Sequence, residues 1–338
     1  MKILVYIEES SIRGGIEIFA ERHVARMRSE GHEVEIVKTL DIGRLTAGRP
    51  AAFDFSPFDE VVVHKCGDVA TLERFPPEKT VYYIHDHEPI CPRSYAYTPL
   101  KHNCTRAGGM WPCIFCAPLC RSWKPALKRV LSQKRRIAAM KKFSRLVVIS
   151  QFMKSRLVAN GIPAEKIVVD PPKIRAGSPF PVPRSLFPVP CSPFPVPHID
   201  LLYAGQLIRG KGVHLLLAAI ARMKSRCTLD IVGTGNMEAK LKAIAGQLGI
   251  SDRVRFNGFQ NNPQDWMRAA KCVVVPSFWQ EPYGLVAAEA VALGRPVVAF
   301  AVGGLPEACG GKATLVPPGD VDALAEALDE EVSKWTAK

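Results

Sequence analysis

The sequence lacks an apolar run long enough to span a lipid bilayer, and it also lacks a secretory signal. A membrane-spanning helix needs about 20 consecutive apolar residues, but the most apolar stretch, residues 285–305, is interrupted by Glu289 and Arg295. The N-terminus reaches Glu8 and Glu9 after a few apolar residues and has no small-residue cleavage site. We therefore expect a cytoplasmic protein whose contact with a membrane would be peripheral, on the inner face.

Acidic residues are absent from a long central segment. No Asp or Glu occurs from Pro89 to Ala164, whereas 15 of the 45 Lys and Arg residues lie there. The rest of the chain carries 30 Lys and Arg against 32 Asp and Glu, so the net charge of +13 is concentrated in this segment. Such a concentration favours an anionic partner. Nucleic acid is not expected, because the segment has no recognised binding motif.

Residues 121–145 of this segment have the pattern of a basic amphipathic helix. Ten Lys and Arg residues surround an apolar set at roughly helical spacing: Leu127, Val130, Leu131, Ile137 and Ala138. A helix of this kind can lie on an anionic membrane surface. An ordinary helix with a solvated basic face explains the pattern equally well.

Strand-like and helix-like patterns alternate along the 338 residues, as in βαβ units that build parallel sheets. In the first half the expected strands are Lys2–Tyr6, Glu33–Lys38, Glu60–His64, Thr80–His85 and Leu146–Ser150. In the second half they are Asp200–Tyr203, Thr228–Val232, Arg253–Phe256, Cys272–Pro276 and Pro296–Phe300. The length suggests two domains. We therefore expect an α/β protein with two Rossmann-like sheets.

A proline-rich repeat separates the two series of strands. Residues 178–197 read SPFPVP, RSLFPVP and CSPFPVP, and proline at this density prevents both helix and central strand. A spacer explains the repeat, and a recognition segment for a proline-binding domain is the alternative. The expected organisation is an N-terminal domain at 1–172, a linker at 173–198 and a C-terminal domain at 199–338.

Two carboxylates flank the start of an apolar helix in the second half. Residues 285–293, LVAAEAVAL, are apolar except for Glu289, so the helix is predicted to be buried. A buried carboxylate needs a partner, and a ligand hydroxyl is one candidate. Glu281 precedes the helix, whose first amides favour a phosphate group. The alternative is structural: Glu289 meets a buried Arg, and Glu281 favours the helix dipole.

The run at 276–290, PSFWQEPYGLVAAEA, resembles the Glu-x7-Glu motif of the retaining glycosyltransferases of family four. The segments YAGQLIRGKG at 203–212, IVGTG at 231–235 and GGLPE at 303–307 are similar to loops of that family. So are Gly14–Gly15 with Glu17, and GHEV at 31–34. The resemblance implies the GT-B fold, in which two Rossmann-like domains have parallel sheets that face each other across a cleft.

The resemblance also implies roles for single residues. Glu281 would hold the donor sugar near its anomeric carbon, and Glu289 would bind the nucleotide ribose. Lys211 would stabilise the leaving diphosphate, while Gln206 stands where the family usually has Arg and Arg209 would compensate for it. His85 would lie close to the reacting sugar. The remaining donor-binding positions are Gly15, Gly233, Tyr283, Gly284, Leu285 and Val286.

The implied activity is transfer, with retention, of a sugar from a nucleotide-diphosphate donor to a saccharide or lipid-linked acceptor bound by the N-terminal domain. Cell-surface polysaccharide or glycolipid synthesis is the implied setting, and the transfer needs no metal. The alternative is an inactive GT-B scaffold that binds nucleotide or acceptor without transfer. Three features favour that alternative: Gln206, the expanded linker, and a C-terminal domain expected to be truncated after the helix at 321–328.

A cysteine-rich insertion at 91–120 provides a separate candidate site. Cys104, Cys113, Cys116 and Cys120 form a C-x8-C-x2-C-x3-C pattern, and four thiolates suit a structural zinc ion. Disulfides, an iron–sulfur centre and buried thiols are the alternatives. The run from His85 to Glu88 is also rich in metal-ligand types, but strand alternation splits it between two faces. We therefore favour a catalytic His85 over a metal cluster.

Overall fold

The computed structural model describes residues 1–8, 15–38, 53–91, 103–104, 113, 123–174 and 199–336. The chain divides into two compact units, Met1–Pro172 and Lys173–Lys338. Each unit contains one six-stranded sheet in which every pairing is parallel. The predicted class of two Rossmann-like sheets is therefore confirmed.

The sheet of the N-terminal unit has the order β2-β1-β3-β4-β5-β6. Its strands are β1 (Lys2–Ile7), β2 (Glu33–Lys38), β3 (Glu60–His64), β4 (Thr80–Ile84), β5 (Arg145–Val148) and β6 (Ile167–Val169). The first five lie where the sequence predicts them, within two residues at each end. The edge strand β6, which has three residues, was not predicted.

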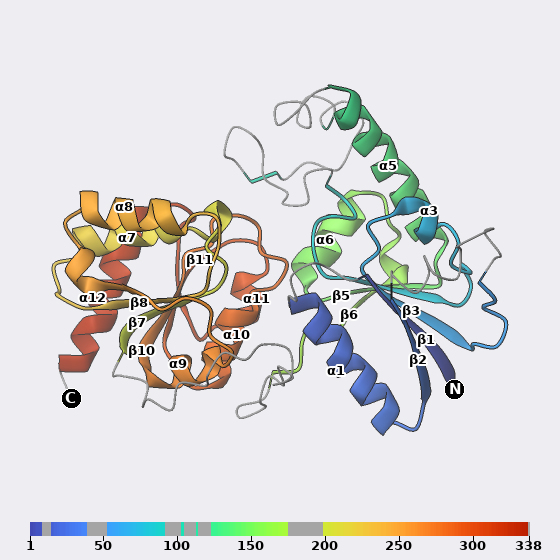
Figure 1. Ribbon diagram of the computed structural model, residues 1–338, viewed down its shortest axis with the longest axis horizontal. Helices are drawn as coiled ribbons and strands as arrows, with labels where there is room; N and C mark the ends of the chain where they lie inside the picture. Colours follow the sequence, from blue (N-terminus) through green and yellow to red (C-terminus); the bar gives the residue numbers. More distant parts are fainter. Residues whose placement is uncertain are drawn as a thin grey trace. The chain divides into compact units, whose positions relative to one another are not determined.

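Alternate residues of these strands pack against helices on opposite faces of the sheet (Figure 1). Ile3 of β1 belongs to a cluster with Val24 of helix α1 (Gly15–Ser29). Leu4, the next residue, belongs to another cluster with Met140 of α5 (Trp123–Lys142) and Met153 of α6 (Gln151–Ala159). A short helix, α3 (Val69–Leu72), contacts α5. The position of a residue along a strand therefore decides whether it faces α1 or α5.

The C-terminal unit has the sheet order β12-β11-β10-β7-β8-β9. Its strands are β7 (Ile199–Ala204), β8 (Leu229–Val232), β9 (Val254–Phe256), β10 (Ala270–Val275), β11 (Val297–Phe300) and β12 (Thr314–Val316). Its helices are α7 (Val213–Arg222), α8 (Glu238–Gln247), α9 (Pro263–Ala269), α10 (Leu285–Ala292), α11 (Leu305–Cys309) and α12 (Val321–Thr336). Helices α7 and α8 lie on one side of this sheet, and α9 and α10 on the other (Figure 1).

The order of these strands reverses between β7 and β10. The chain runs outward from β7 through β8 to β9, then returns to β10 on the other side of β7 and runs outward again. In open parallel sheets the loops after two such strands diverge and leave a crevice where ligands bind. The loops that follow β7 and β10 are therefore the first place to look for a site.

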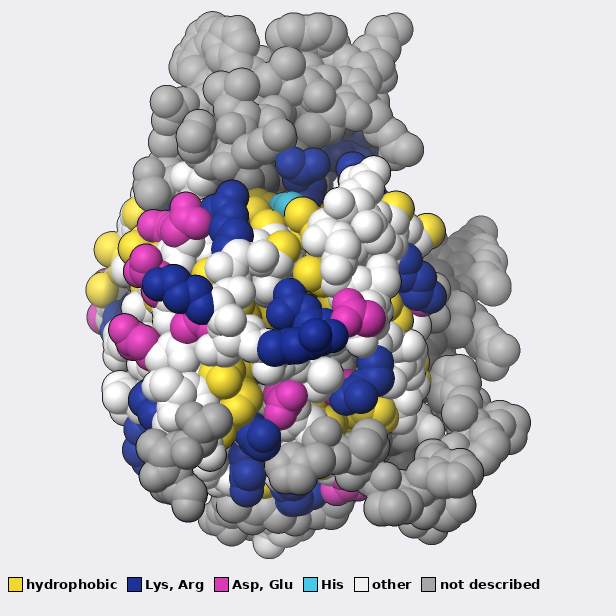
Figure 2. Space-filling model, turned by 90° about the vertical axis from the view of Figure 1, so that its left-hand side faces the viewer, with side chains coloured by type: hydrophobic (Ala, Val, Ile, Leu, Met, Phe, Trp, Pro, Cys, Tyr) yellow, Lys and Arg dark blue, Asp and Glu magenta, His cyan; other side chains and the backbone are white. Residues whose placement is uncertain are grey.

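The C-terminal unit is nearly neutral. Residues 199–338 carry 15 Lys and Arg against 14 Asp and Glu. Figure 2, which looks onto this unit, shows side chains of both signs interspersed over the surface. The excess positive charge of the chain therefore resides elsewhere, in agreement with the charge pattern of residues 89–164.

Candidate functional site

The loops after β7 and β10 touch through their backbones. The loop after β7 contains a single 3-10 turn, η3 (Arg209–Lys211), and the Phe278 amide donates to the Gly210 carbonyl at 3.2 Å. Gly212 has φ +73°, and a Cβ atom there would lie 1.8 Å from the carbonyl oxygen of Pro276. Only glycine fits such a close approach. The two loops therefore form one packed layer at the carboxyl ends of β7 and β10.

Lys211 and Glu281 meet in this layer. The Lys211 ammonium lies 2.6 Å from Oε1 of Glu281, and the Trp279 indole N–H donates to the same oxygen at 3.0 Å. Glu281 is 7% exposed. Its burial would raise the pKa of its carboxyl, but the Lys211 charge and hydrogen bonds from Lys211, Ser277 and Trp279 outweigh burial and leave that pKa lowered. Glu281 is therefore ionised at neutral pH.

The N-terminus of α10 lies directly after this pair. Gly284 precedes the helix with φ +111° and adds no side-chain cap to its first amides. The loop at Gly303–Gly304 supports the turn: the Gly304 amide donates to the Glu281 carbonyl at 2.7 Å. A Cβ atom on Gly303 would lie 2.4 Å from that same carbonyl oxygen. Glu289 is in the second turn of α10 and is 5% exposed, as predicted for a buried helix.

The structure places the other predicted donor-binding residues as follows. Gln206 and Arg209 are exposed on the loop after β7. The amide of Gly233, after β8, donates to the carbonyl of Gly258 at 2.7 Å. A Cβ atom on Gly233 would lie 1.9 Å from the Gly205 carbonyl oxygen, so this glycine lets two loops approach. Gly15 belongs to the N-terminal unit, where it is the first residue of α1.

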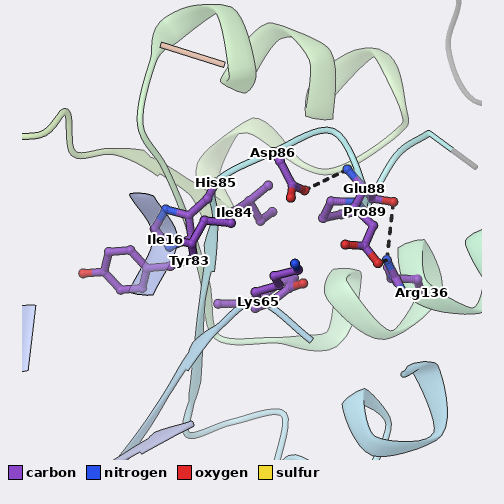
Figure 3. Close-up of a pocket in the computed structure, with 10 residues that line it drawn as sticks. Ile16, Lys65, Tyr83, Ile84, His85, Asp86, Glu88, Pro89 and Arg136 are labelled. Carbon is purple, nitrogen blue, oxygen red and sulfur yellow. Dashed lines mark hydrogen bonds and ion pairs between the residues drawn. The ribbon is translucent and has the colours of Figure 1, made fainter. Parts of the chain in front are cut away.

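The N-terminal unit has its own pocket at the ends of β3 and β4 (Figure 3). His85 lines it together with the charged side chains of Lys65, Asp86, Glu88 and Arg136, and apolar residues such as Ile16, Ile84 and Pro89 complete the lining. The Glu88 amide donates to Asp86 at 2.9 Å, and Arg136 pairs with the Glu88 carboxylate at 3.3 Å. Burial, and then the Glu88 charge, raise the pKa of Asp86 to about 6. Asp86, Glu88 and Arg136 therefore form one connected polar group in the wall of the pocket.

His85 is the end of a chain of buried hydrogen-bonding rings. Its Nε2 lies 3.0 Å from Nδ1 of His64, whose Nε2 lies 3.0 Å from Nδ1 of His23. The hydroxyl of Tyr83 lies 3.3 Å from Nε2 of His23. Burial, with smaller contributions from neighbouring charges, lowers the pKa of His23 to about 4, of His85 to about 3, and of His64 well below its usual value. All three imidazoles are therefore neutral at pH 7.

The predicted split of the run from His85 to Glu88 between two faces is found, but strand alternation does not cause it. Alternation would place His85 and His87 on one face, whereas β4 ends at Ile84 and the turn that follows sends them to opposite faces. His85 lies on the α1 face, where the Phe19 ring packs edge-on at 4.9 Å. His87 packs against Phe152 of α6 on the opposite face. Within the described ranges, no group of three His, Cys, Asp or Glu side chains is arranged to hold a metal ion.

Sequence reasoning missed several side chains at both sites. They are His23, His64 and Tyr83 in the N-terminal unit, and Ser277 and Trp279 in the C-terminal unit. A signal for His64 was present, because it ends the β3 run as His85 follows β4, and neighbouring parallel strands place such residues together. Trp279 lies two residues before Glu281, but a single aromatic residue in a loop does not reveal its contacts.

Two further predictions concern the segment between β4 and β5. Of the four proposed zinc ligands, Cys104 and Cys113 are described, whereas Cys116 and Cys120 lie outside the described residues, so the zinc site stays a prediction. The predicted basic helix at 121–145 is α5, Trp123–Lys142. Two of its cationic side chains form ion pairs within the N-terminal unit: Arg136 is buried against Glu88, and Arg135 pairs with Glu73. No helix in the described part of the chain has both the length and the apolar character to cross a membrane.

Part of this chain is similar in sequence to known glycosyltransferases. The family model for Glycosyl transferases group 1 matches residues 198–333. An uncharacterised glycosyltransferase of Methanocaldococcus jannaschii is 36% identical over 141 residues, which are 40% of this chain and 36% of that protein. D-inositol 3-phosphate glycosyltransferase of Streptomyces griseus is 42% identical over 143 residues, or 38% of this chain and 30% of that enzyme. The chain thus matches about a third of the length of these curated relatives.

Solved structures match both units. Anabaena HepE in complex with UDP aligns with a TM-score of 0.67 at 20% identity, covering 99% of this chain and 91% of HepE. WaaG, a glycosyltransferase involved in lipopolysaccharide biosynthesis, aligns with a TM-score of 0.63 at 16% identity and the same coverage. The two parallel sheets are those of GT-B glycosyltransferase structures. The part of the chain that matches the Glycosyl transferases group 1 family is residues 198–333, within the C-terminal unit.

Proposed function

We propose that the protein is a retaining glycosyltransferase that moves a sugar from a nucleotide-diphosphate donor to a saccharide or lipid-linked acceptor. The observation that carries this proposal is the ion pair between half-buried Lys211 and buried Glu281 at the N-terminus of α10, within the segment that matches the family. HepE, which shares the fold, has been solved with UDP and with UDP-glucose. A nucleotide-diphosphate sugar is therefore the donor class that we propose.

Donor binding would use positive charge at the carboxyl ends of β7 and β10. The Lys211 ammonium and the first amides of α10 would meet the diphosphate, and exposed Arg209 would add a second cation on the same loop as Gln206. Charge develops on the leaving diphosphate as the sugar departs, so these groups would stabilise the transition state more than the ground state. Ionised Glu281 would face the sugar, and Glu289 would bind the ribose.

Retention would follow from attack on the face that the diphosphate leaves. A leaving phosphate oxygen would take the proton of the acceptor hydroxyl, so no protein base is needed at that step. His85 in the N-terminal pocket would contact the reacting sugar by donating or accepting a hydrogen bond. Lys211, Arg209 and the α10 amides would supply the positive charge that other transferases take from a metal ion, so the proposal includes no metal in the transfer.

The donor site can be tested by calorimetric titration with UDP, GDP, ADP and their glucose conjugates. We expect one nucleotide series to bind, and Lys211→Ala to weaken that binding at least about tenfold, since a charge-assisted hydrogen bond contributes about 1.5–3 kcal/mol. Lys242→Ala is the matched control, because Lys242 is an exposed lysine paired with Glu238 on α8. No binding in any series, or equal effects of the two variants, would contradict the assignment. Binding without turnover would support the inactive scaffold instead.

We further infer that α5 brings the enzyme to the inner face of the cytoplasmic membrane, close to a lipid-linked acceptor used in cell-surface polysaccharide or glycolipid synthesis. Leu127 and Leu131, one turn apart, are both 48% exposed between the exposed cations Lys128, Arg129 and Lys134. An apolar strip among cations fits the boundary of an anionic bilayer. Sedimentation with vesicles should retain the protein when anionic lipid is present, and replacing both leucines by Ser should release it. Equal retention of the double variant would refute the inference.

A further inference from the structure

The N-terminal unit contains an unbranched chain of three hydrogen bonds that begins at Tyr83, passes through His23 and His64, and ends at His85. Strand register explains the arrangement, because His64 pairs with Tyr83 across β3 and β4 and both face α1, which carries His23. The rings pack against one another: the ring centroid of His64 lies 4.6 Å from that of Tyr83 and 5.3 Å from that of His85, and the centroids of His23 and Tyr83 are 4.7 Å apart. These rings do not converge on a common point as metal ligands would.

All three hydrogen bonds of this chain must point in the same direction. A neutral imidazole has one N–H donor and one acceptor nitrogen. His23 and His64 each use both ring nitrogens in the chain, so the direction of one bond fixes the direction of the next. Only two states are available. Either Tyr83 donates and every bond runs toward His85, or His85 donates and every bond runs toward Tyr83.

The Tyr83 end favours the first state. Burial raises the pKa of Tyr83 to about 12, so its hydroxyl keeps the proton. Among the described residues, His23 Nε2 is the one hydrogen-bond partner of that hydroxyl. If the chain ran toward Tyr83, the phenolic O–H would be a buried donor without an acceptor, and such groups are unfavourable. If the chain of hydrogen bonds runs toward His85, the Tyr83 hydroxyl donates its proton to Nε2 of His23.

The His85 end favours the same state. If the hydrogen bonds run toward His85, its Nε2 is an acceptor and its proton lies on Nδ1. No described residue provides a hydrogen-bond partner for that Nδ1–H group. The His85 side chain lines the pocket, where solvent or a ligand can accept from that N–H (Figure 3).

We propose that His64 and His23 are positioning residues that, together with the Tyr83 hydroxyl, hold His85 as a neutral Nδ1–H donor aimed at an oxygen of the sugar. His85 would then orient a sugar oxygen and would not act as a base. The sugar as ligand rests on the proposed function. The fixed tautomer does not, because it depends on contacts inside the N-terminal unit alone.

The tautomer can be read directly by long-range proton–nitrogen NMR correlation of the full-length protein labelled with nitrogen-15 histidine. Protonated and unprotonated ring nitrogens have well separated shifts, and the eight histidines are assigned with single His→Gln variants. At pH 7.5 we expect His23, His64 and His85 to be protonated at Nδ1 and unprotonated at Nε2. The Nδ1–H tautomer should exceed the other by about fivefold or more, because it avoids leaving the buried Tyr83 hydroxyl without an acceptor. A proton on Nε2 of His85 would overturn the proposal.

Tyr83→Phe tests whether the chain sets the tautomer. This variant keeps the ring and removes the donor, so the Nδ1–H excess on His85 should fall to within about threefold of equality. Tyr82→Phe is the matched control, because Tyr82 is the adjacent buried tyrosine of β4 and packs in the opposite cluster. His85 in that control should keep the wild-type tautomer. An unchanged tautomer in Tyr83→Phe would show that His64 and His23 do not transmit the effect.

Substitution of His85 tests the donor against the sugar. An Asn amide can place an N–H near the position of Nδ1, whereas Gln reaches the position of Nε2. Affinity for UDP-glucose relative to UDP should therefore fall less in His85→Asn than in His85→Gln, and equal losses would contradict a donor at Nδ1. If wild-type protein binds neither nucleotide, the proposed function fails, whereas the NMR result still decides the tautomer.

Discussion

Acidification should destabilise the N-terminal unit through its buried histidines. Folding lowers the pKa of His23 from 6.5 to about 4 and of His85 from 6.5 to about 3, mainly because burial disfavours the charged ring. Between those values and 6.5 the unfolded chain binds protons that the folded chain does not. The free energy of unfolding is therefore undiminished above about pH 6.5 and falls as the pH decreases below it. The lowered pKa of His64 acts in the same direction.

The size of the effect follows from these values. Each such histidine loses about 1.4 kcal/mol of stabilisation per pH unit below 6.5, so His23 and His85 together account for about 4 kcal/mol at pH 5.0. Asp86 opposes them, because burial and Glu88 raise its pKa to about 6 and the folded state then gains a proton first. At pH 5.0 the proton bound by folded Asp86 contributes about 1.4 kcal/mol to the free energy of unfolding. The net loss from pH 7.5 to 5.0 is therefore about 2–3 kcal/mol.

Urea unfolding of the whole chain at the two pH values measures this loss. Pulsed hydrogen exchange at one fixed pH, read on peptides that cover β3 and β4, reports the N-terminal unit separately. Asp86→Asn removes the opposing carboxyl and keeps an oxygen that can accept from the Glu88 amide. The fall in the free energy of unfolding of this variant from pH 7.5 to 5.0 should therefore rise to about 4 kcal/mol. If wild-type stability is unchanged or higher at pH 5.0, or if Asp86→Asn loses no more than wild type, the reasoning is refuted.

Three further predictions concern the loops after β7 and β10. Lys211→Met should lower the free energy of unfolding by about 3 kcal/mol, since it leaves Glu281 charged and buried. Adding Glu281→Gln should restore most of that free energy. Urea unfolding that shows no recovery in the double variant would contradict this coupling. Gly212→Ala should be more destabilising than Gly249→Ala. Gly249 has a similar φ of +67°, but no atom lies within 4 Å of a Cβ added there. Similar unfolding midpoints of the two variants would show that the close approach at Gly212 does not matter for stability. Trp279→Phe should lower stability by about 1 kcal/mol by deleting the indole hydrogen bond, and unchanged thermal unfolding would show that this bond is not needed.

Much of the fold could be predicted because buried parallel strands are short apolar runs with recognisable boundaries. Ten of the twelve strands in the described part of the chain were expected from such runs. The two that were missed, β6 and β12, are edge strands of three residues, but β9 has the same length and an edge position and was predicted, so length and position alone do not explain the difference. Helix α12 continues to Thr336, beyond the expected end at Leu328, because Leu324 and Leu328 are followed by a further buried turn at Val332.

The candidate site was predictable only in part. Glu281 and Lys211 could be singled out from the pattern around α10 and the loop after β7, but their direct contact at 2.6 Å could not. That contact joins residues 70 positions apart, and it depends on how closely two loops approach at a glycine. The link from His23 to His64 is equally remote, since it spans 41 positions and depends on how α1 packs on the sheet.

The alternation of faces in β3 and β4 also limits how the N-terminal unit can change through insertion and deletion. His64 and His85 reach the same side of the sheet because each lies an even number of residues from neighbours on that side, Val62 and Tyr83. Removing a single residue from the middle of either strand would turn its histidine toward the opposite side and break the chain of rings. Length changes inside the strands preserve the arrangement only in steps of two, and the segment between them is itself held in place, because Leu72 and Phe75 are buried in the core.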